Sequence, residues 1–202
     1  MAERGGAKAG PEAQQPLSAL MRKATQSLHE RVEAALPWMH RAVTPEEYAL
    51  HLRRLWPLVA ATEAALAPWL SQLAQLCSDE RLLQRRAPLL QQDCQALGLQ
   101  AAPFGAFPTL ACSSLPNAVG CWYVLGGSRL GGQMIYRRLR DQVATAAAPA
   151  LRYYAACCPS DGGLFRKFLA AVDRQADLAR HRDEVVDGAV TTFTHWYNGL
   201  TH

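Results

Sequence analysis

The chain lacks the features that mark several large classes of protein. It contains no apolar run near the roughly 20 residues that a membrane-spanning helix requires, and its first residues do not form the apolar core of a secretory signal. The formal net charge is only +4 over 202 residues, and the basic residues are spread along the chain instead of being gathered beside aromatic residues. These absences argue against a membrane protein and against a nucleic-acid binder.

The chain contains six cysteines, but their spacing is typical neither of a metal site nor of a disulfide framework. No Cys-x-x-Cys pair occurs, and the spacings fit no set of metal ligands. Cys121 falls on an apolar helix face, where a thiol is usually a small core residue. Cys157 and Cys158 are adjacent, too close for an easy disulfide, and are expected in a loop. The sequence therefore predicts a cytoplasmic protein with reduced thiols.

The remaining composition is that of one globular domain. Half of the residues are apolar and 19% are charged, and the length is sufficient for one substantial core. Residues 1–16 are rich in Gly, Ala, Pro and charge without periodic apolar positions, so they are predicted to form a disordered tail. Residues 17–202 are predicted to form a single helical domain.

Apolar residues recur at helical spacing along most of that domain. Thr44, Pro45 and Glu47 form a capping box that predicts the start of one helix. No segment alternates with period two, so we expect an all-α bundle. The predicted helices span residues 17–36, 44–66 with a bend or an interruption at Pro57, 78–99 with a break or a kink near Pro88, 117–143, 160–179 and 182–200.

The predicted helix 117–143 carries a glycine cluster in the stretch "VLGGSRLGGQMIYRRL". Each glycine inside a helix costs about 1 kcal/mol relative to alanine. Such a cost calls for a reason. The four glycines are Gly126, Gly127, Gly131 and Gly132.

Three explanations compete for the cluster. A phosphate-binding loop fails, because Gln133 and Met134 stand where that motif needs Lys and Ser or Thr. Close packing of two helices through small residues remains possible. The third explanation is a ligand site, in which the absence of Cβ atoms lets a large flat ligand touch the helix backbone. Such a ligand with a metal centre needs a metal-binding residue on an opposing wall.

His29 in the first predicted helix is the candidate for that residue. Thr25 lies one turn before it and Glu33 one turn after it on the same side of the helix. Arg22 lies two turns before it, about 10 Å along the axis, an offset that suits an axial ligand of haem iron and a cation that pairs with a haem propionate. The alternatives are a packed or solvent-facing histidine and a solvated arginine.

Two segments, "ATQSLHERVE" and "YVLGGSRLGGQMI", resemble in this order the two signature segments of the haem oxygenase family, and in particular its bacterial biliverdin-producing members. The resemblance extends over most of residues 17–200. It implies a haem oxygenase-like helical bundle in which haem is sandwiched between a proximal helix and a kinked, glycine-rich distal helix. By that resemblance His29 is the proximal iron ligand, with Glu33 beside it.

The distal helix departs from the family pattern at two positions. Ser128 stands where mammalian members carry aspartate, and a neutral hydroxyl does not replace a carboxylate electrostatically. Gly126 stands where bacterial members often carry glutamate. The resemblance implies that Ser128, Gly127 and Gly131 serve catalysis. The candidate haem-binding residues are His29, Glu33, Thr25, Arg22, Tyr123, Gly127, Gly131, Gly132, Arg166 and Phe193.

The implied reaction is the oxidative opening of haem, which is both cofactor and substrate, to biliverdin, carbon monoxide and ferrous iron. It consumes dioxygen and electrons from an external donor, which is a ferredoxin, a flavoprotein reductase or ascorbate. A photoreceptor that uses a bilin is a possible partner. The alternatives are a haem-binding protein of the same fold that stores, transfers or senses haem, and a di-iron or cofactor-free helical protein. The paired Glu-x-x-His motifs of a di-iron bundle are absent from the sequence.

Overall fold

The computed structural model describes residues 15–36, 41–99, 109–142 and 150–201, and this part of the chain is helical without a strand. The predicted tail 1–16 lies outside the described residues except for its last two positions. In chain order the elements are α1 (Leu17–Ala35), α2 (Pro45–Leu66), η3 (Ala67–Trp69), α3 (Leu70–Leu76), η4 (Glu80–Leu83), α4 (Ala87–Ala96), α5 (Leu115–Gln142), α6 (Arg152–Ala155), α7 (Asp161–Asp173), α8 (Ala176–Arg180) and α9 (Arg182–Thr201).

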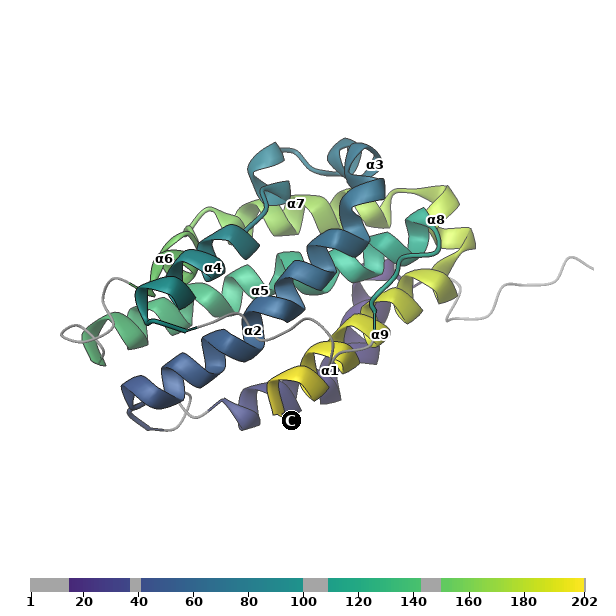
Figure 1. Ribbon diagram of the computed structural model, residues 1–202. Coiled ribbons are helices and arrows are strands. Elements are labelled where there is room, and N and C mark those ends of the chain that lie inside the picture. The colour runs from purple at the N-terminus through teal and green to yellow at the C-terminus, as the bar shows by residue number, and fades with distance from the viewer. Residues whose placement is uncertain (1–14, 37–40, 100–108, 143–149, 202) are drawn as a thin grey trace, which may run out of the picture.

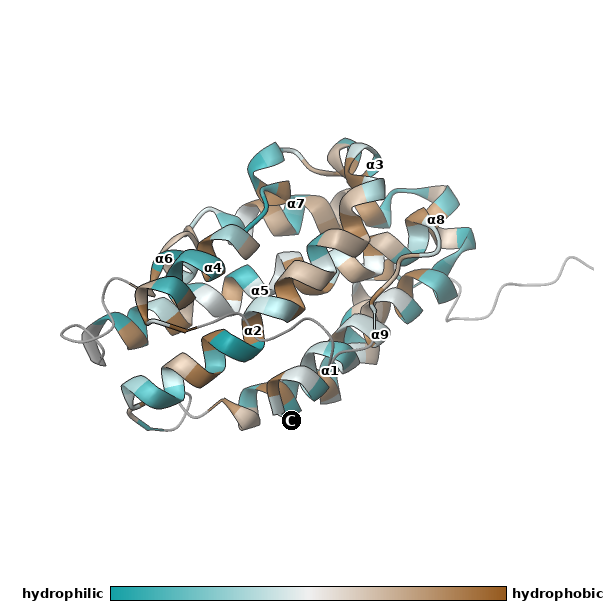
Figure 2. Ribbon diagram, in the orientation of Figure 1, coloured by the Kyte–Doolittle hydropathy of each residue, from teal (hydrophilic) through white to brown (hydrophobic). Residues whose placement is uncertain are grey.

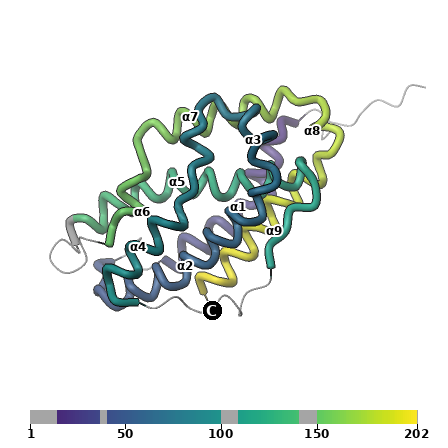
Figure 3. The backbone as a smooth tube through the Cα atoms, turned by 45° about the horizontal axis from the view of Figure 1, so that its top comes forward, coloured from purple at the N-terminus to yellow at the C-terminus, as the bar shows by residue number. Residues whose placement is uncertain are grey.

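Helix α5 runs through the middle of the bundle, between α7 on one side and α9 on the other (Figures 1 and 3). Helix α9 packs along both α5 and α1. The contact between α5 and α9 is close because glycine stands at the crossing. A Cβ on Gly120 would collide with the backbone carbonyl of Val185, and a Cβ on Gly188 would collide with that of Asn117.

The core consists of two clusters. The first surrounds Trp122, Phe165 and Phe168, where α5 meets α7, and the second surrounds Tyr48 and Leu139, where α2 meets α5. Figure 2 shows the change along α2 from hydrophilic residues near its start to hydrophobic residues near its end. No helix among the described residues is long and apolar enough to cross a membrane.

Carboxylates from one helix cap the start of another. Asp93 on α4 accepts hydrogen bonds from the backbone N–H groups of Arg152 (3.0 Å) and Tyr153 (2.9 Å) at the start of α6. Glu63 on α2 accepts from the backbone N–H groups of Arg86 (2.5 Å) and Ala87 (3.1 Å) at the start of α4. These bonds satisfy N–H groups that have no partner within their own helix. They also connect distant parts of the chain.

The all-α prediction is confirmed, and so is the capping box at Thr44. The break predicted near Pro88 is confirmed, because η4 ends at Leu83 and α4 begins at Ala87. Pro88 lies in the first turn of α4, where its missing N–H costs nothing. Helix α2 continues through Pro57. Helices α3 and α6 were not predicted, since they are too short to show a clear apolar period. The helix predicted over residues 160–179 is divided into α7 and α8. Cys121 is buried, and Cys157 and Cys158 lie between α6 and α7 as expected.

Candidate functional site

A contact between α1 and α5 sets the position of the candidate site. The phenol of Tyr123 on α5 interacts with the hydroxyl of Thr25 on α1, which is buried and donates a hydrogen bond to the Met21 carbonyl (2.8 Å). Burial raises the pKa of the Tyr123 phenol, while Thr25 and the nearby positive charge of Arg22 lower it. Three of the candidate residues, Arg22, Thr25 and Tyr123, are thus brought together.

His29 lies on α1 one turn beyond this contact. Its imidazole is 58% exposed, and its ring packs edge-on against Phe193 of α9, with the two ring centres 5.9 Å apart. Its Nδ1 is 3.6 Å from a carboxylate oxygen of Glu33. Among the described residues no hydrogen bond occupies Nε2. The carboxylate and the aromatic ring hold the imidazole, and the second nitrogen is available to a metal.

Two of the four clustered glycines lie where a flat ligand has room. A Cβ built on Gly131 would meet no heavy atom within 4 Å, and one on Gly127 would touch only the Phe165 ring, at 3.4 Å. The large apolar side chains of Leu130 (41% exposed) and Met134 (46% exposed) stand beside them. An exposed apolar helix surface with open glycine positions is the kind of wall that a planar, largely apolar ligand needs.

The other two glycines have packing reasons. A Cβ on Gly132 would lie 2.6 Å from the Cys157 sulfur, and a Cβ on Gly126 would collide with the ring of Trp122 one turn earlier on α5. Gly132 therefore fits the close-packing explanation for the cluster, whereas Gly126 leaves room for the Trp122 ring on its own helix. The sequence did not distinguish Gly132 from the open glycines, because its neighbours Tyr154 and Cys157 come from α6 and the loop after it.

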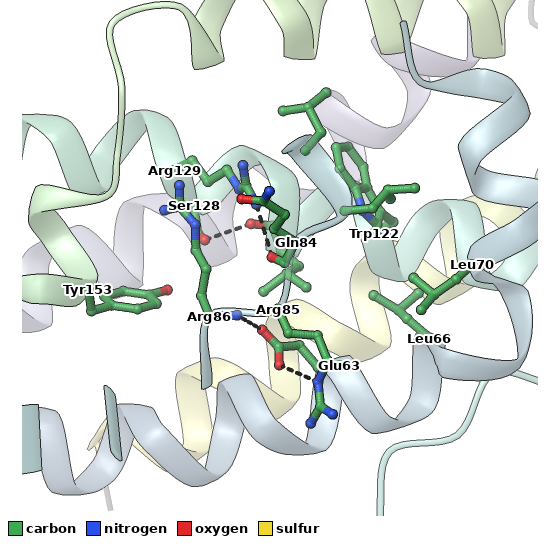
Figure 4. A pocket seen from close by; sticks show the side chains of 13 residues that line it. Glu63, Leu66, Leu70, Gln84, Arg85, Arg86, Trp122, Ser128, Arg129 and Tyr153 are labelled. Atoms are coloured by element: carbon green, nitrogen blue, oxygen red, sulfur yellow. Dashed lines mark hydrogen bonds and ion pairs between the residues drawn. The ribbon is translucent and has the colours of Figure 1, made fainter. Parts of the chain in front are cut away.

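Ser128 faces a small cavity between α2, α5, α6 and the segment of η4 and residues 84–86 (Figure 4). Its hydroxyl donates a hydrogen bond to the Leu125 carbonyl (2.7 Å) and interacts with the phenol of Tyr153. The cavity has a volume of about 20 Å³, enough for one water molecule, and Glu63 and Arg86 also line it. Ser128 lies about 100° around the helix from Gly127, at the margin of the open glycine face.

Buried charges that the sequence did not single out surround this cavity. Arg129 donates to the carbonyls of Arg81 (3.1 Å) and Gln84 (3.3 Å), and Arg86 forms an ion pair with Asp161 (3.4 Å). Burial lowers the pKa of Arg129. An arginine in a helical pattern is usually solvated, so no sequence signal marked these residues.

Arg166 is not part of the cluster of Arg22, Thr25 and Tyr123. It lies on the exposed side of α7, with its guanidinium 3.7 Å from the position that a Cβ on Gly162 would take. Among the described residues there is no group of three or more His, Cys, Asp or Glu side chains that could hold a metal ion. A metal in this site would depend on His29 and on a ligand that brings the other donors. A porphyrin is such a ligand.

Comparison with known proteins agrees with this arrangement. A family model described as Heme oxygenase matches residues 15–200. The chain belongs to the haem oxygenase family. A protein named Heme oxygenase from Xanthomonas campestris pv. campestris (strain 8004) is 32% identical over 158 residues, which are 78% of this chain and 91% of the relative.

Solved structures of haem oxygenases have the same fold. The enzyme from Leptospira interrogans superposes with a TM-score of 0.73 at 16% identity, covering 93% of this chain and 99% of that one. The NO- and CO-bound enzyme from Neisseria meningitidis gives a TM-score of 0.67 at 18% identity, with 92% and 90% covered. Haem oxygenase 2 from Chlamydomonas reinhardtii, solved without haem, gives 0.68 at 20% identity, with 92% and 96% covered. The expected haem oxygenase fold is confirmed.

Proposed function

We propose that the protein is a haem oxygenase that opens haem to biliverdin, carbon monoxide and ferrous iron, in the cytoplasm. Family membership makes it an oxidoreductase that uses haem. The observation that carries the proposal is that an exposed His29 on α1 and the open Gly127 and Gly131 on α5 lie beyond the same contact between the two helices. His29 comes one turn after Thr25, and the two glycines come one and two turns after Tyr123. Haem, when bound, supplies the iron and the macrocycle at which dioxygen and external electrons react.

The residues present fit that group. His29 would bind the iron through Nε2, while Glu33 would accept from Nδ1–H and fix the ring orientation. Gly127 and Gly131 would let the ring lie against the backbone of α5 because neither carries a Cβ. Gly132, which packs against Cys157, would contribute by keeping α5 close to the α6–α7 loop.

Polar residues near the contact between α1 and α5 would hold the haem edge. Arg22 carries a positive charge beside Tyr123, and a cation and a phenol together suit a propionate. Thr25 would orient the Tyr123 phenol. Arg166 would contact the haem only if the bound haem extends as far as α7. These contacts would set the in-plane rotation of haem and therefore the meso carbon that is attacked.

Ser128 would orient water near the distal side. Its hydroxyl is neutral, so its contribution is hydrogen bonding without charge. The electrons would come from a ferredoxin, a flavoprotein reductase or ascorbate. The product would either release iron for use by the cell or supply the chromophore of a bilin-using photoreceptor.

The test is to add hemin to the purified protein and to follow the absorption spectrum under air with ascorbate or a ferredoxin system, in the presence of catalase. The expected result is a Soret band that decays as extractable biliverdin appears. A Soret band that survives reduction and oxygenation contradicts the proposed turnover and indicates a haem carrier or sensor. Failure to form a Soret band contradicts haem binding itself.

A further inference from the structure

A hydrogen-bonded tyrosine and histidine lie behind α5 and have no part in the proposed haem site. Tyr154 on α6 and His51 on α2 are buried, and the Tyr154 hydroxyl is 2.5 Å from His51 Nε2. Their rings are nearly parallel, at an angle of 16°. The Tyr154 ring also packs on α5, where a Cβ on Gly132 would lie 3.5 Å from it. The pair therefore touches the helix that carries the open glycine Gly131.

The direction of this hydrogen bond follows from the partners available. Among the described residues His51 is the one hydrogen-bond partner of the Tyr154 hydroxyl. If His51 Nε2 carried the proton, the phenolic O–H would be buried without an acceptor, which is costly. The Tyr154 O–H therefore donates to an unprotonated Nε2. Burial keeps both groups neutral, since it raises the pKa of Tyr154 well above its usual value and lowers that of His51 to about 3.

A second tyrosine connects the pair to Ser128. The ring of Tyr153 packs edge-on against that of Tyr154, with the ring centres 5.1 Å apart, and its phenol interacts with the Ser128 hydroxyl. The two neighbouring tyrosines thus contact α5 at Ser128 and at Gly132. Each of these residues adjoins one of the open glycines, Gly127 or Gly131.

We propose that Tyr154 and His51 form a proton-coupled redox pair that takes up oxidising equivalents produced when hydrogen peroxide reacts with bound haem. The inference rests on the proposed function. One electron leaves the Tyr154 ring for the peroxide-oxidised iron, which is reduced by one electron. The phenolic O–H bond breaks, and its proton forms an N–H bond at His51 Nε2. Tyr154 becomes a neutral radical and His51 an imidazolium. An electron from the external donor that turnover requires then reduces the Tyr154 radical, and the proton returns from His51 Nε2 to the phenolic oxygen.

The surroundings of the pair suit this step. A phenol that has lost an electron is a far stronger acid than imidazolium, so even an imidazole with a lowered pKa accepts its proton. Among the described residues, the charge of Asp93 acts on Tyr154 and that of Arg54 acts on His51. The Asp93 carboxylate favours the positive charge that the step creates, whereas Arg54 opposes it. Tyr154 is only 3% exposed, so its phenol is shielded from solvent.

The first experiment needs no haem. Nitrogen-15 NMR of the histidine side chains in the apo-protein is expected to show His51 with an unprotonated Nε2 that accepts a hydrogen bond, and Tyr154→Phe is expected to shift that resonance. A protonated Nε2 in the wild-type protein overturns the proposal, because the phenol would then have no proton acceptor.

The second experiment traps the radical. The ferric haem complex is mixed with hydrogen peroxide and frozen for electron paramagnetic resonance. The expected result is a tyrosyl signal that is lost in Tyr154→Phe and retained in Tyr197→Phe, a tyrosine on α9 that faces Arg31. His51→Phe is expected to shorten the lifetime of the signal. An unchanged signal in Tyr154→Phe, or no tyrosyl signal from a complex that shows a Soret band, overturns the proposal.

Two controls distinguish loss of the redox pair from misfolding of the variant and from failure to bind haem. If Tyr154→Phe unfolds, the double variant Tyr154→Phe/His51→Phe removes both partners of the hydrogen bond and leaves no buried polar atom unpaired. If the protein forms no Soret band, the proposed function fails, and ultraviolet flash photoionisation of the apo-protein tests the pair alone. A long-lived tyrosyl absorbance that Tyr154→Phe removes supports the redox pair, and its persistence in Tyr154→Phe overturns it.

Discussion

Thr25 on α1 and Tyr123 on α5 interact across the two helices, and this contact brings the two halves of the candidate haem site to the same level in the bundle. One turn after Thr25 comes His29, and one turn after Tyr123 comes Gly127. The imidazole and the open glycine face therefore belong to corresponding turns of neighbouring helices. Four predictions follow from the residues around this contact and from the buried histidine behind α5.

The first prediction concerns His29. We expect His29→Ala to lose the Soret spectrum of the wild-type haem complex and its turnover, because Nε2 is the proposed iron ligand. The melting temperature of the apo-protein should change little, since the side chain is 58% exposed. The matched control is His181→Ala, an exposed histidine whose Nδ1 also faces a carboxylate, 2.9 Å from Glu184. A His29→Ala variant that binds and degrades haem like the wild type contradicts the assignment.

The second prediction separates the two kinds of glycine. Gly131→Ala should raise the free energy of unfolding of the apo-protein by about 1 kcal/mol, because alanine favours the helix and its Cβ meets nothing. The same variant should bind haem more weakly. Gly132→Ala should lower the free energy of unfolding by about 1–3 kcal/mol, because its Cβ would overlap the Cys157 sulfur. Denaturant unfolding and hemin titration measure both effects.

The cause of the Gly132 effect can be checked with a compensating change. Cys157→Ala removes the sulfur that a Cβ at position 132 would meet at 2.6 Å. The double variant Gly132→Ala/Cys157→Ala should therefore be less destabilised than the sum of the two single variants. Strict additivity of the two changes would show that the overlap is not the cause.

The third prediction concerns the propionate contact. Arg22 is exposed on α1 and places its charge beside Tyr123. We expect Arg22→Ala to broaden the distribution of biliverdin isomers, because a haem with a weaker edge contact takes more than one in-plane orientation. Chromatography of the extracted bilins measures the distribution. The neighbouring residue supplies the control: Lys23→Ala removes an equal charge from another side of α1 and should leave the isomers unchanged.

The fourth prediction is a loss of stability in mild acid. Burial holds the pKa of His51 at about 3, below the value of about 6.5 for an unfolded histidine. The unfolded chain therefore binds more protons than the folded one between these values. The contribution of neutral His51 is fully present above pH 6.5, and it is lost as the pH falls toward 3, at about 1.4 kcal/mol per pH unit.

Urea unfolding at pH values from 7 to 5 tests this prediction. His195, whose pKa is also lowered by burial, adds to the slope in the same window. The comparison with His51→Gln isolates the contribution of His51, because glutamine binds no proton. The variant is expected to have the shallower dependence on pH, whatever its stability at pH 7. Equal slopes for the two proteins would contradict a neutral, buried His51.

The helices whose ends and apolar faces depend on nearby residues could be predicted from the sequence alone. The capping box at Thr44 and the apolar periods along α1, α5 and α9 fixed these elements, because capping and amphipathic spacing depend on residues within a few turns. His29 and the glycines were found in the same way, through two short segments with a recognisable pattern. Short helices such as α6 escaped prediction because four residues carry no period.

What each of these residues contacts depends on the packing of the helices and could not be predicted from the sequence. Gly131 and Gly132 are adjacent in sequence, yet one has open space and the other is closed by Cys157, which comes from the loop after α6. The contact between Thr25 and Tyr123 and the hydrogen bond between His51 and Tyr154 join residues about a hundred positions apart. Such neighbours follow from how the helices pack around α5, and no local pattern in the sequence carries that information.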